Sequence, residues 1–418
     1  MKSTLTNLAI FGGRPSFDEP LHVGRPNIGN RDRLLRRIND ILDRKWLSNN
    51  GPYVQEFERR IADLIGVKHC IAACNGTVAL EIAIRAVGLK GSVIVSAFTA
   101  PATVHALEWQ GIKPLFCDID PETLCLDPGH VEKMIREDVS GMVGVHLFGR
   151  PCQIRELEEI AKSKNLKLIF DAAHAFGCSI NGRMIGNFGD AEVFSFHATK
   201  FLNAFEGGAV VTNNDELAMK IRSMKNFGYS SWDTVVCEGT NGKMSEVSAA
   251  MGITSLESMD ELIAANKRNY HLYREGLKGV PGVHLMEPDD RSGSRNYQYI
   301  VLEVDQESAR LRRDDLIAVL HAERVLARRY FYPGCHKIEP YRSRFPNGHV
   351  FLPVTELAVE RIMQLPNGAS IGPAEIKLIC NIIAVSIENA EKIRRFLNDK
   401  PVVSENVSPF RKDLTTVS

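Results

Sequence analysis

Residues 191–212 read AEVFSFHATKFLNAFEGGAVVT, which is two apolar runs joined by a turn. The runs AEVFSFHA (191–198) and GAVVT (208–212) are rich in Val and Phe and show little polar alternation, which is typical of strands buried on both faces. Only nine residues separate them, so they need not be parallel neighbours, because a parallel crossover needs a dozen or more. The turn carries Lys200 in an apolar, glycine-flanked setting, where lysine is seldom placed without a partner.

Five further runs of the same kind precede this stretch, and helical patterns lie between most of them. The runs are KHCIAAC (68–74), SVIVSAF (92–98), KPLFCDI (113–119), GMVGVHLF (141–148) and LKLIFDAA (166–173). Alternating strands and helices indicate βαβ units. The sequence therefore predicts an α/β large domain with a mostly parallel sheet flanked by helices.

The pattern changes beyond about residue 245. A long helical region is followed by the strand-like YQYIVLEV (297–304) and the helical LRRDDLIAVLHAE, which predict a smaller α+β C-terminal domain. We expect an N-terminal segment, 1–50, that packs on this small domain. The large domain is then 51–255, the small domain 256–400, and residues 401–418 a polar tail.

Composition excludes several classes of function. The 418 residues carry 51 basic and 51 acidic side chains, so no overall basic field is available to attract nucleic acid. The nine cysteines are scattered, as expected for reduced thiols in a cytoplasmic protein. Cys70 and Cys74 lack the spacing of a zinc knuckle, and the apolar LICNIIAVSI is too short to span a bilayer. We expect no metal site and no membrane partner.

Chemically useful residues follow three of the predicted strands, at the sheet edge where α/β proteins bind ligands. Asn75, Gly76 and Thr77 open a helix, and they could form either a phosphate cradle or an ordinary N-cap. Asp171 could cap a turn or hold a cation. Lys200 could extend to the surface, or it could be a desolvated amine that attacks carbonyl groups.

Together these residues match the needs of one cofactor. Pyridoxal phosphate (PLP) requires an anion site for its phosphate, an acid beside its ring nitrogen and a lysine for its aldehyde. A cradle at Gly76–Thr77, the carboxylate of Asp171 and the amine of Lys200 would supply all three. The combination favours chemistry over the separate structural interpretations.

Several motifs, in one order along nearly the whole chain, resemble those of the sugar aminotransferases. These PLP-dependent fold-type-I enzymes, of DegT/DnrJ/EryC1/StrS type, act on nucleotide-linked keto-deoxysugars. The motifs are WLSNNGPYVQEFE (46–58), CNGTVAL (74–80), FCDIDPETLCLDP (116–128), GVHLFGRP (144–151), DAAHAFG (171–177), FSFHATK (194–200), EGGAVVTN (206–213), GTNGKMSEVSAAMG (239–252) and LPNGASIG (365–372).

The resemblance assigns roles to individual residues. It implies that Lys200 forms the Schiff base and then moves a proton, and that Asp171 pairs with the pyridine nitrogen. His174 stands where the family usually has glutamine, near the ring hydroxyl, and its tautomer then matters. The implied phosphate ligands are Gly76, Thr77, Ser195 and, reaching into the neighbouring subunit, Asn241. The implied assembly is therefore a homodimer with shared active sites.

Two positions depart from the family pattern. The family often has an aromatic residue that stacks on the cofactor ring at the position of Ala100, and it usually has glycine at the position of Phe205. Phe98 lies close to Ala100 but would point the other way along a regular strand end. The ring would therefore be covered by something else, or less tightly.

The implied reaction moves an amino group from glutamate to a keto sugar. The N-terminal LHVGRPNIGNRD and the ARRYFYPGCHKIEPYR segment look most like enzymes that aminate C4 of a dTDP-linked 4-keto-6-deoxyhexose, with a 3-keto sugar as the alternative. There are three rival interpretations: a sister branch with histidine in place of the lysine, a non-catalytic PLP-binding regulator, and another fold-type-I enzyme. Candidate ligands for the sugar-nucleotide pyrophosphate are Arg328, Arg329, Tyr330 and His336. A solvent-exposed basic turn with no ligand would show the same residue pattern.

Overall fold

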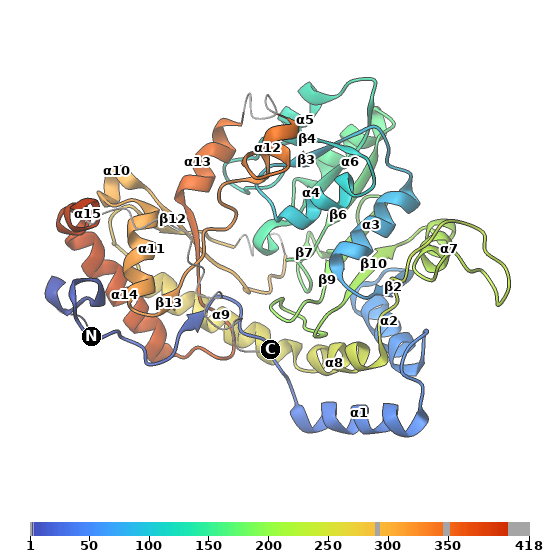
Figure 1. Ribbon diagram of the computed structural model, residues 1–418, viewed down its shortest axis with the longest axis horizontal. Coiled ribbons are helices and arrows are strands. Elements are labelled where there is room, and N and C mark those ends of the chain that lie inside the picture. Colours follow the sequence, from blue (N-terminus) through green and yellow to red (C-terminus); the bar gives the residue numbers. More distant parts are fainter. Residues whose placement is uncertain (1, 3, 289–292, 346–351, 400–418) are drawn as a thin grey trace, which may run out of the picture.

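The computed structural model describes residues 2, 4–288, 293–345 and 352–399. Its large domain is built on a seven-stranded sheet with the order β2-β10-β9-β6-β5-β3-β4 (Figure 1). The strands are β2 (His69–Ala73), β3 (Ser92–Ser96), β4 (Lys113–Cys117), β5 (Val139–Val145), β6 (Lys167–Asp171), β9 (Ala191–Ser195) and β10 (Gly208–Thr212). Each lies within or overlaps one of the seven predicted runs, so the α/β fold class is confirmed.

Strand β10 runs antiparallel to both of its neighbours, β2 and β9, whereas the other neighbouring pairs are parallel. The connection from β9 to β10, residues 196–207, explains the antiparallel pairing with β9, because it contains no helix to carry the chain across the sheet for a parallel crossover. Gly208 therefore pairs with Ala73 on one side and Ser195 on the other. This pairing brings the first residue of β10 to the ends of β2 and β9, where Asn75 and Lys200 follow.

Helices cover both faces of this sheet (Figure 1). Alternate side chains of the strands point to opposite faces. One set packs with α3 (Gly76–Val87), α4 (Pro101–Glu108) and α7 (Asp215–Met224), and the other with α2 (Pro52–Ile65), α6 (Ile154–Ser163) and α8 (Glu246–Leu256). The shorter α5 (Pro128–Met134) and the hairpin of β7 (Ser179–Ile180) and β8 (Arg183–Met184) complete the large domain. The strands are buried on both faces, as their composition predicts.

The small domain has an antiparallel sheet of order β11-β12-β14 and its own apolar core. Helix α9 (Met259–Gly276) leads into it from α8 (Figure 1). Its remaining elements are β11 (Val283–Leu285), β12 (Ile300–Val304), α10 (Gln306–Ala309), α11 (Arg313–Ala322), β13 (Val325–Leu326), α12 (Tyr341–Arg344), α13 (Pro353–Arg361), β14 (Ile362–Leu365), α14 (Pro373–Glu388) and α15 (Ala390–Asp399), with 3-10 turns at Leu5–Asn7, Ala9–Phe11, Leu147–Gly149 and Cys335–Lys337.

The N-terminal segment divides between two packing partners. Buried Glu323 accepts hydrogen bonds from the backbone N–H groups of Ala9 and Ser16, and β1 (Leu21–His22) pairs with β13. Helix α1 (Arg31–Arg44) packs instead on α8. Only the first part of the predicted 1–50 segment therefore lies on the small domain, because α1 has an apolar face that α8 covers. The predicted tail, 401–418, lies outside the described residues. Within the described residues, no helix combines the length and apolar character needed to cross a bilayer.

Candidate active site

Lys200 lies in the turn between β9 and β10, and its backbone N–H donates to the carbonyl of His197. The side chain is half-buried by surface area, but its amine lies deep in the protein. Burial lowers the pKa of Lys200 from its ordinary value to about 8, although the negative charge of Asp171 opposes the shift. A much larger fraction of this amine than of an ordinary lysine is therefore neutral near physiological pH, and the neutral form is the one that a nucleophile requires.

Asp171 is the last residue of β6, and its carboxylate is held in place by two donors. Its Oδ2 accepts from the hydroxyl of Thr103 at 2.8 Å, and its Oδ1 accepts from the backbone N–H of Ala173 at 3.1 Å. The side chain is buried, and a buried carboxylate of this kind is suited to partner a cationic ring N–H. Thr103 was missed by sequence reasoning, because a threonine one turn into a helix gives no sign that it faces a carboxylate on another strand.

His174 is a neutral hydrogen-bond donor in this site. Burial, together with the charge of Lys200, lowers the pKa of His174 well below its ordinary value. Its Nδ1 lies 3.2 Å from the backbone nitrogen of Phe148, which can only donate. The ring proton is thereby assigned to Nε2. His174 therefore presents one N–H, as the amide of the usual glutamine would.

The first turn of α3 forms a cradle beside Lys200. Asn75 caps the helix, because its Oδ1 accepts from the N–H of Val78 at 2.8 Å. This capping interpretation is confirmed, and it leaves the first-turn N–H groups of Gly76 and Thr77 without an intrahelical acceptor. A Cβ on Gly76 would lie 2.8 Å from the Cβ of Ser195, so only glycine permits the approach. The cap and the cradle coexist, with Gly76, Thr77 and Ser195 gathered at one point.

Asn241 lies beside the cradle of its own chain, on an exposed loop. Its neighbour Gly242 accepts a hydrogen bond through its carbonyl from the N–H of Cys74 at 2.8 Å. The side chain of Asn241 is exposed, and its backbone pairs with that of Asn226. Its role toward a neighbouring subunit stays a prediction.

The four predicted substrate residues do not form one cluster. Arg328 is exposed and lies over the ring of Tyr330 at 4.6 Å. Arg329 forms an ion pair with Asp314 at 3.0 Å. His336 is buried, and its Nε2 lies 2.8 Å from Glu356. The side chains of Arg329 and His336 are thus already engaged by carboxylates.

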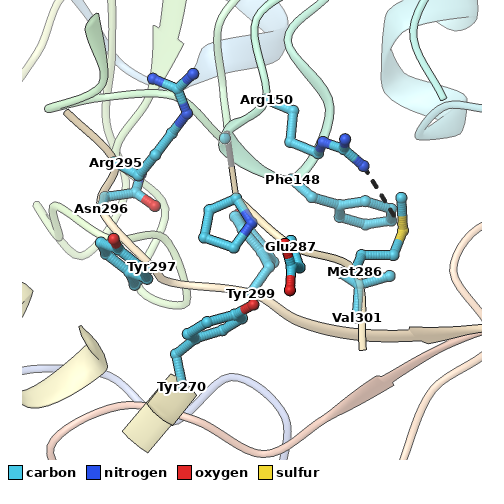
Figure 2. A pocket seen from close by; sticks show the side chains of 12 residues that line it. Phe148, Arg150, Tyr270, Met286, Glu287, Arg295, Asn296, Tyr297, Tyr299 and Val301 are labelled. Atoms are coloured by element: carbon cyan, nitrogen blue, oxygen red, sulfur yellow. Dashed lines mark hydrogen bonds between the residues drawn. The ribbon is translucent and has the colours of Figure 1, made fainter. Parts of the chain in front are cut away.

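An aromatic wall stands beside His174, and sequence reasoning did not find it. The ring centroid of Tyr299 lies 4.6 Å from that of His174, and the ring of Phe148 is nearly parallel to the imidazole at 5.9 Å. Behind Phe148, a cavity of about 30 Å³ separates the 148–150 loop from the small-domain segment 295–301. Figure 2 shows Tyr270, Tyr297 and Tyr299 gathered on its small-domain side. The contacts of Tyr299 with His174 and with Phe148 join residues more than 100 positions apart, so no local pattern signals them.

An asparagine of the small domain holds the turn that carries His174. The Nδ2 of Asn296, buried in the protein, donates to the carbonyl groups of His174 and Phe176, each at 3.0 Å. The turn that carries His174 is therefore fixed to the small domain as well as to the large one.

A family model agrees with this geometry. Residues 30–384 match the DegT/DnrJ/EryC1/StrS aminotransferase family. The chain belongs to this family. It is an aminotransferase, and its cofactor is PLP. The buried amine, the carboxylate on β6 and the cradle at α3 fit that cofactor, because each meets one of its three requirements.

Relatives of this aminotransferase act on nucleotide-linked sugars by name. A dTDP-4-amino-4,6-dideoxy-D-glucose transaminase of Shigella dysenteriae is 38% identical over 325 residues, which is 78% of this chain and 88% of the relative. A GDP-perosamine synthase of Vibrio cholerae is 31% identical and covers 86% of this chain and 97% of its own length. A crystal structure of DesI in the presence of its TDP-sugar product superposes with a TM-score of 0.91 at 47% identity, covering 95% of this chain and 100% of DesI.

Proposed function

We propose that this aminotransferase transfers an amino group from glutamate to C4 of a dTDP-linked 4-keto-6-deoxyhexose. The amination site is supported by the dTDP-4-amino-4,6-dideoxy-D-glucose transaminases of Shigella dysenteriae and Escherichia coli, which are 38% and 32% identical. The dTDP nucleotide agrees with the similarity to DesI, a structure that holds a TDP-sugar product.

One observation carries the proposal: the amine of Lys200 lies deep in the protein, beside the carboxylate of Asp171, with its pKa lowered to about 8. When bound, PLP supplies an aldehyde carbon and an electron-withdrawing ring. Lys200 in its neutral form can accept the proton from Cα of the amino donor and later return one at the sugar carbon. Asp171 holds a proton at the ring nitrogen, and Thr103 fixes the orientation of its carboxylate.

The other site residues bind the cofactor and orient it. We propose that Gly76, Thr77 and Ser195 bind the cofactor phosphate, with the positive end of α3 contributing. His174 donates its Nε2–H to the ring hydroxyl. The cap at Asn75 fixes the first turn of α3, and the backbone donor at Phe148 fixes the tautomer of His174.

For the pyrophosphate of the sugar nucleotide, we propose Arg328 and Tyr330 as the main ligands of the four candidates. The guanidinium of Arg328 is exposed and stacks on Tyr330, so it can turn toward an anion without breaking an ion pair. Arg329 and His336 would first have to leave Asp314 and Glu356.

The proposed reaction can be tested with purified enzyme, glutamate and a panel of nucleotide sugars, with mass spectrometry of the products. The panel should hold dTDP-linked 4-keto and 3-keto deoxyhexoses and a GDP-linked 4-keto sugar. We expect amination of the dTDP-4-keto sugar, and none with Lys200→Ala. Amination of only the 3-keto sugar, or of none with every amino donor, would contradict the proposal.

We also propose a homodimer in which Asn241 of one chain reaches the cradle of the other. An arm formed by residues 226–242 extends from the large domain beyond α7 (Figure 1) and exposes Trp232 by 96%. Other large apolar side chains of the arm and of the region around α1 are also exposed: Phe227, Tyr229, Val235, Val236, Leu35, Leu42, Trp46 and Leu47. Apolar surface of this extent supports a partner, and a second copy of the chain is the partner that the resemblance implies.

Subunit complementation tests this assembly. A Lys200→Ala chain and an Asn241→Ala chain are each expected to have little activity alone. When mixed, the Asn241→Ala chain keeps its own Lys200 and receives an intact asparagine from its partner, so activity should return. If Asn241 served its own site, mixing would restore nothing. Trp232→Ser should weaken the dimer, whereas Trp109→Ser, which removes an 83% exposed tryptophan outside the arm and α1, should not.

We propose a cytoplasmic location for the enzyme. All nine cysteines are free thiols in the structure, as a reducing compartment requires. Free-thiol counting on protein isolated under alkylating conditions should find nine.

A further inference from the structure

Ala100 leaves one side of the cofactor site without the ring that the family usually places there. It precedes Pro101 as the N-terminal cap residue of α4 and is half-buried. Phe98 cannot take its place, because that side chain is only 1% exposed and packs in the core of the large domain. Another part of the chain would have to supply an aromatic face.

Phe331 comes to this position from the segment that leaves the small domain. Its ring meets the edge of Phe98 at 5.9 Å and 81°. It is nearly parallel to Phe148, at 5.9 Å and 5°, and to His174, at 6.2 Å and 10°. The ring is half-buried. Phe331 therefore belongs to the aromatic wall and joins it, through Phe98, to the loop after β3 that ends at Ala100.

Three hydrogen bonds hold this ring at the strand end. The N–H of Gly334 donates to the carbonyl of Phe331 at 2.7 Å and closes a tight turn. The next residue, Cys335, donates its N–H to the carbonyl of Ala97 at 2.8 Å and its thiol to the carbonyl of Thr99 at 3.3 Å. Phe331 is thus fixed relative to residues 97–99, and not merely close to them.

We propose that Phe331 covers the face of the cofactor ring that Ala100 leaves open. The inference rests on the proposed function, because it assumes that the ring lies between Asp171 and Lys200. His174 would reach the edge of that ring, and Phe331, 6.2 Å from His174 and anchored to residues 97–99, is the aromatic side chain placed to lie against it. The residue that stacks on the cofactor has moved from the start of α4 to a small-domain segment, and this makes cofactor binding depend on how that segment is anchored.

The test uses four variants and two measurements. The variants are Phe331→Leu, Phe331→Tyr, Ala100→Tyr with Phe331→Leu, and Phe345→Leu as a matched control on a half-buried ring of the same segment. The dissociation constant of PLP is measured by titrating apoenzyme, and the circular dichroism of the bound chromophore reports the asymmetry of the ring's surroundings. Thermal unfolding of each apoenzyme confirms that the variant is folded.

Phe331→Leu should weaken PLP binding by roughly two- to tenfold, the usual worth of an aromatic contact, and should reduce the chromophore's dichroism. Phe331→Tyr and Phe345→Leu should leave both unchanged. Ala100→Tyr in the Phe331→Leu background should restore both, because it returns the ring to the position where the family has it. Recovery by a substitution in a distant segment of the chain is not expected of a merely structural residue.

Two results would overturn the inference. If Phe331→Leu keeps the dissociation constant and the dichroism but raises the KM of the sugar nucleotide, the ring contacts substrate and not cofactor. If all variants behave as wild type, Phe331 covers neither. Failure of the proposed function is distinguishable from both, because it appears as the wrong product, or none, when wild-type enzyme meets the sugar panel, whereas PLP affinity and dichroism are measured without any sugar.

Discussion

The lowered pKa of Lys200 leads to a quantitative prediction about its reactivity. With a pKa of about 8, roughly a tenth of Lys200 is neutral at pH 7, which is about 200-fold more than for a lysine of ordinary pKa near 10.4. Because only the neutral amine attacks electrophiles, Lys200 in the apoenzyme should be the fastest-reacting lysine that a small reagent can reach.

Competitive labelling measures this directly. The apoenzyme is exposed at a series of pH values to a trace of acetic anhydride, and the label on each lysine peptide is quantified by mass spectrometry, with exposed Lys162 as internal reference. Labelling of Lys200 should rise through a midpoint near pH 8. In Asp171→Asn the midpoint should fall further, because the carboxylate's charge favours the protonated amine.

The same shift has a consequence for stability. The folded pKa of Lys200 lies below its unfolded value, so the unfolded chain binds more protons between about pH 8 and pH 10.5, and the contribution of Lys200 to apoenzyme stability rises with pH across that window. The penalty below pH 8 is on the order of 3 kcal/mol before solvent screening. Lys200→Met should lack this rise, so the stability of the wild-type apoenzyme relative to the variant should increase across that window. A labelling midpoint near 10.5, or a higher midpoint in Asp171→Asn, would refute the reasoning.

Three further substitutions test the surrounding contacts. Thr103→Val removes the hydroxyl that donates to buried Asp171. A hydrogen bond to a charged group is worth on the order of 1.5–3 kcal/mol, so titration of the apoenzyme should show PLP affinity falling at least tenfold. An unchanged affinity would count against the assigned contact. His174→Gln should keep most of the turnover in a steady-state assay, because glutamine also presents an N–H, whereas His174→Leu should lose it; equal losses would contradict the donor role. Gly76→Ala places a Cβ 2.8 Å from that of Ser195. In parallel titrations it should weaken the binding of PLP more than the binding of phosphate-free pyridoxal. An equal loss of affinity for both would mean that Gly76 does not contact the phosphate.

The large-domain sheet could be predicted from sequence because its signal is local. Strands such as Ser92–Ser96 are fully buried, and burial on both faces selects an uninterrupted apolar run. The nine-residue connection before Gly208 also allowed β10 to be antiparallel to its neighbour. Lys200 and Asp171 could be found as candidates because the carboxyl ends of parallel strands lie at one edge of the sheet, which is where α/β proteins bind their ligands.

The parts that escaped prediction depend on contacts between distant segments. The Thr103 hydroxyl finds Asp171 across the sheet edge, and Phe331 reaches Phe148 from the small domain. Neither has a periodic or motif signal of its own. The basic residues near position 330 look alike in sequence, yet Arg329 is paired with Asp314, whereas Arg328 has no acidic partner within the described part of the chain. Partners of this kind are set by tertiary packing, which a single sequence does not reveal.

The central claim is that Lys200 is the amine that holds the cofactor. The most direct measurement reduces the PLP-loaded enzyme with borohydride, digests it and locates the added pyridoxyl group by mass spectrometry. The account predicts the group on Lys200 in the wild-type enzyme and on no lysine in Lys200→Ala. A pyridoxyl group on another lysine of the wild-type enzyme, with Lys200 unmodified, would contradict it.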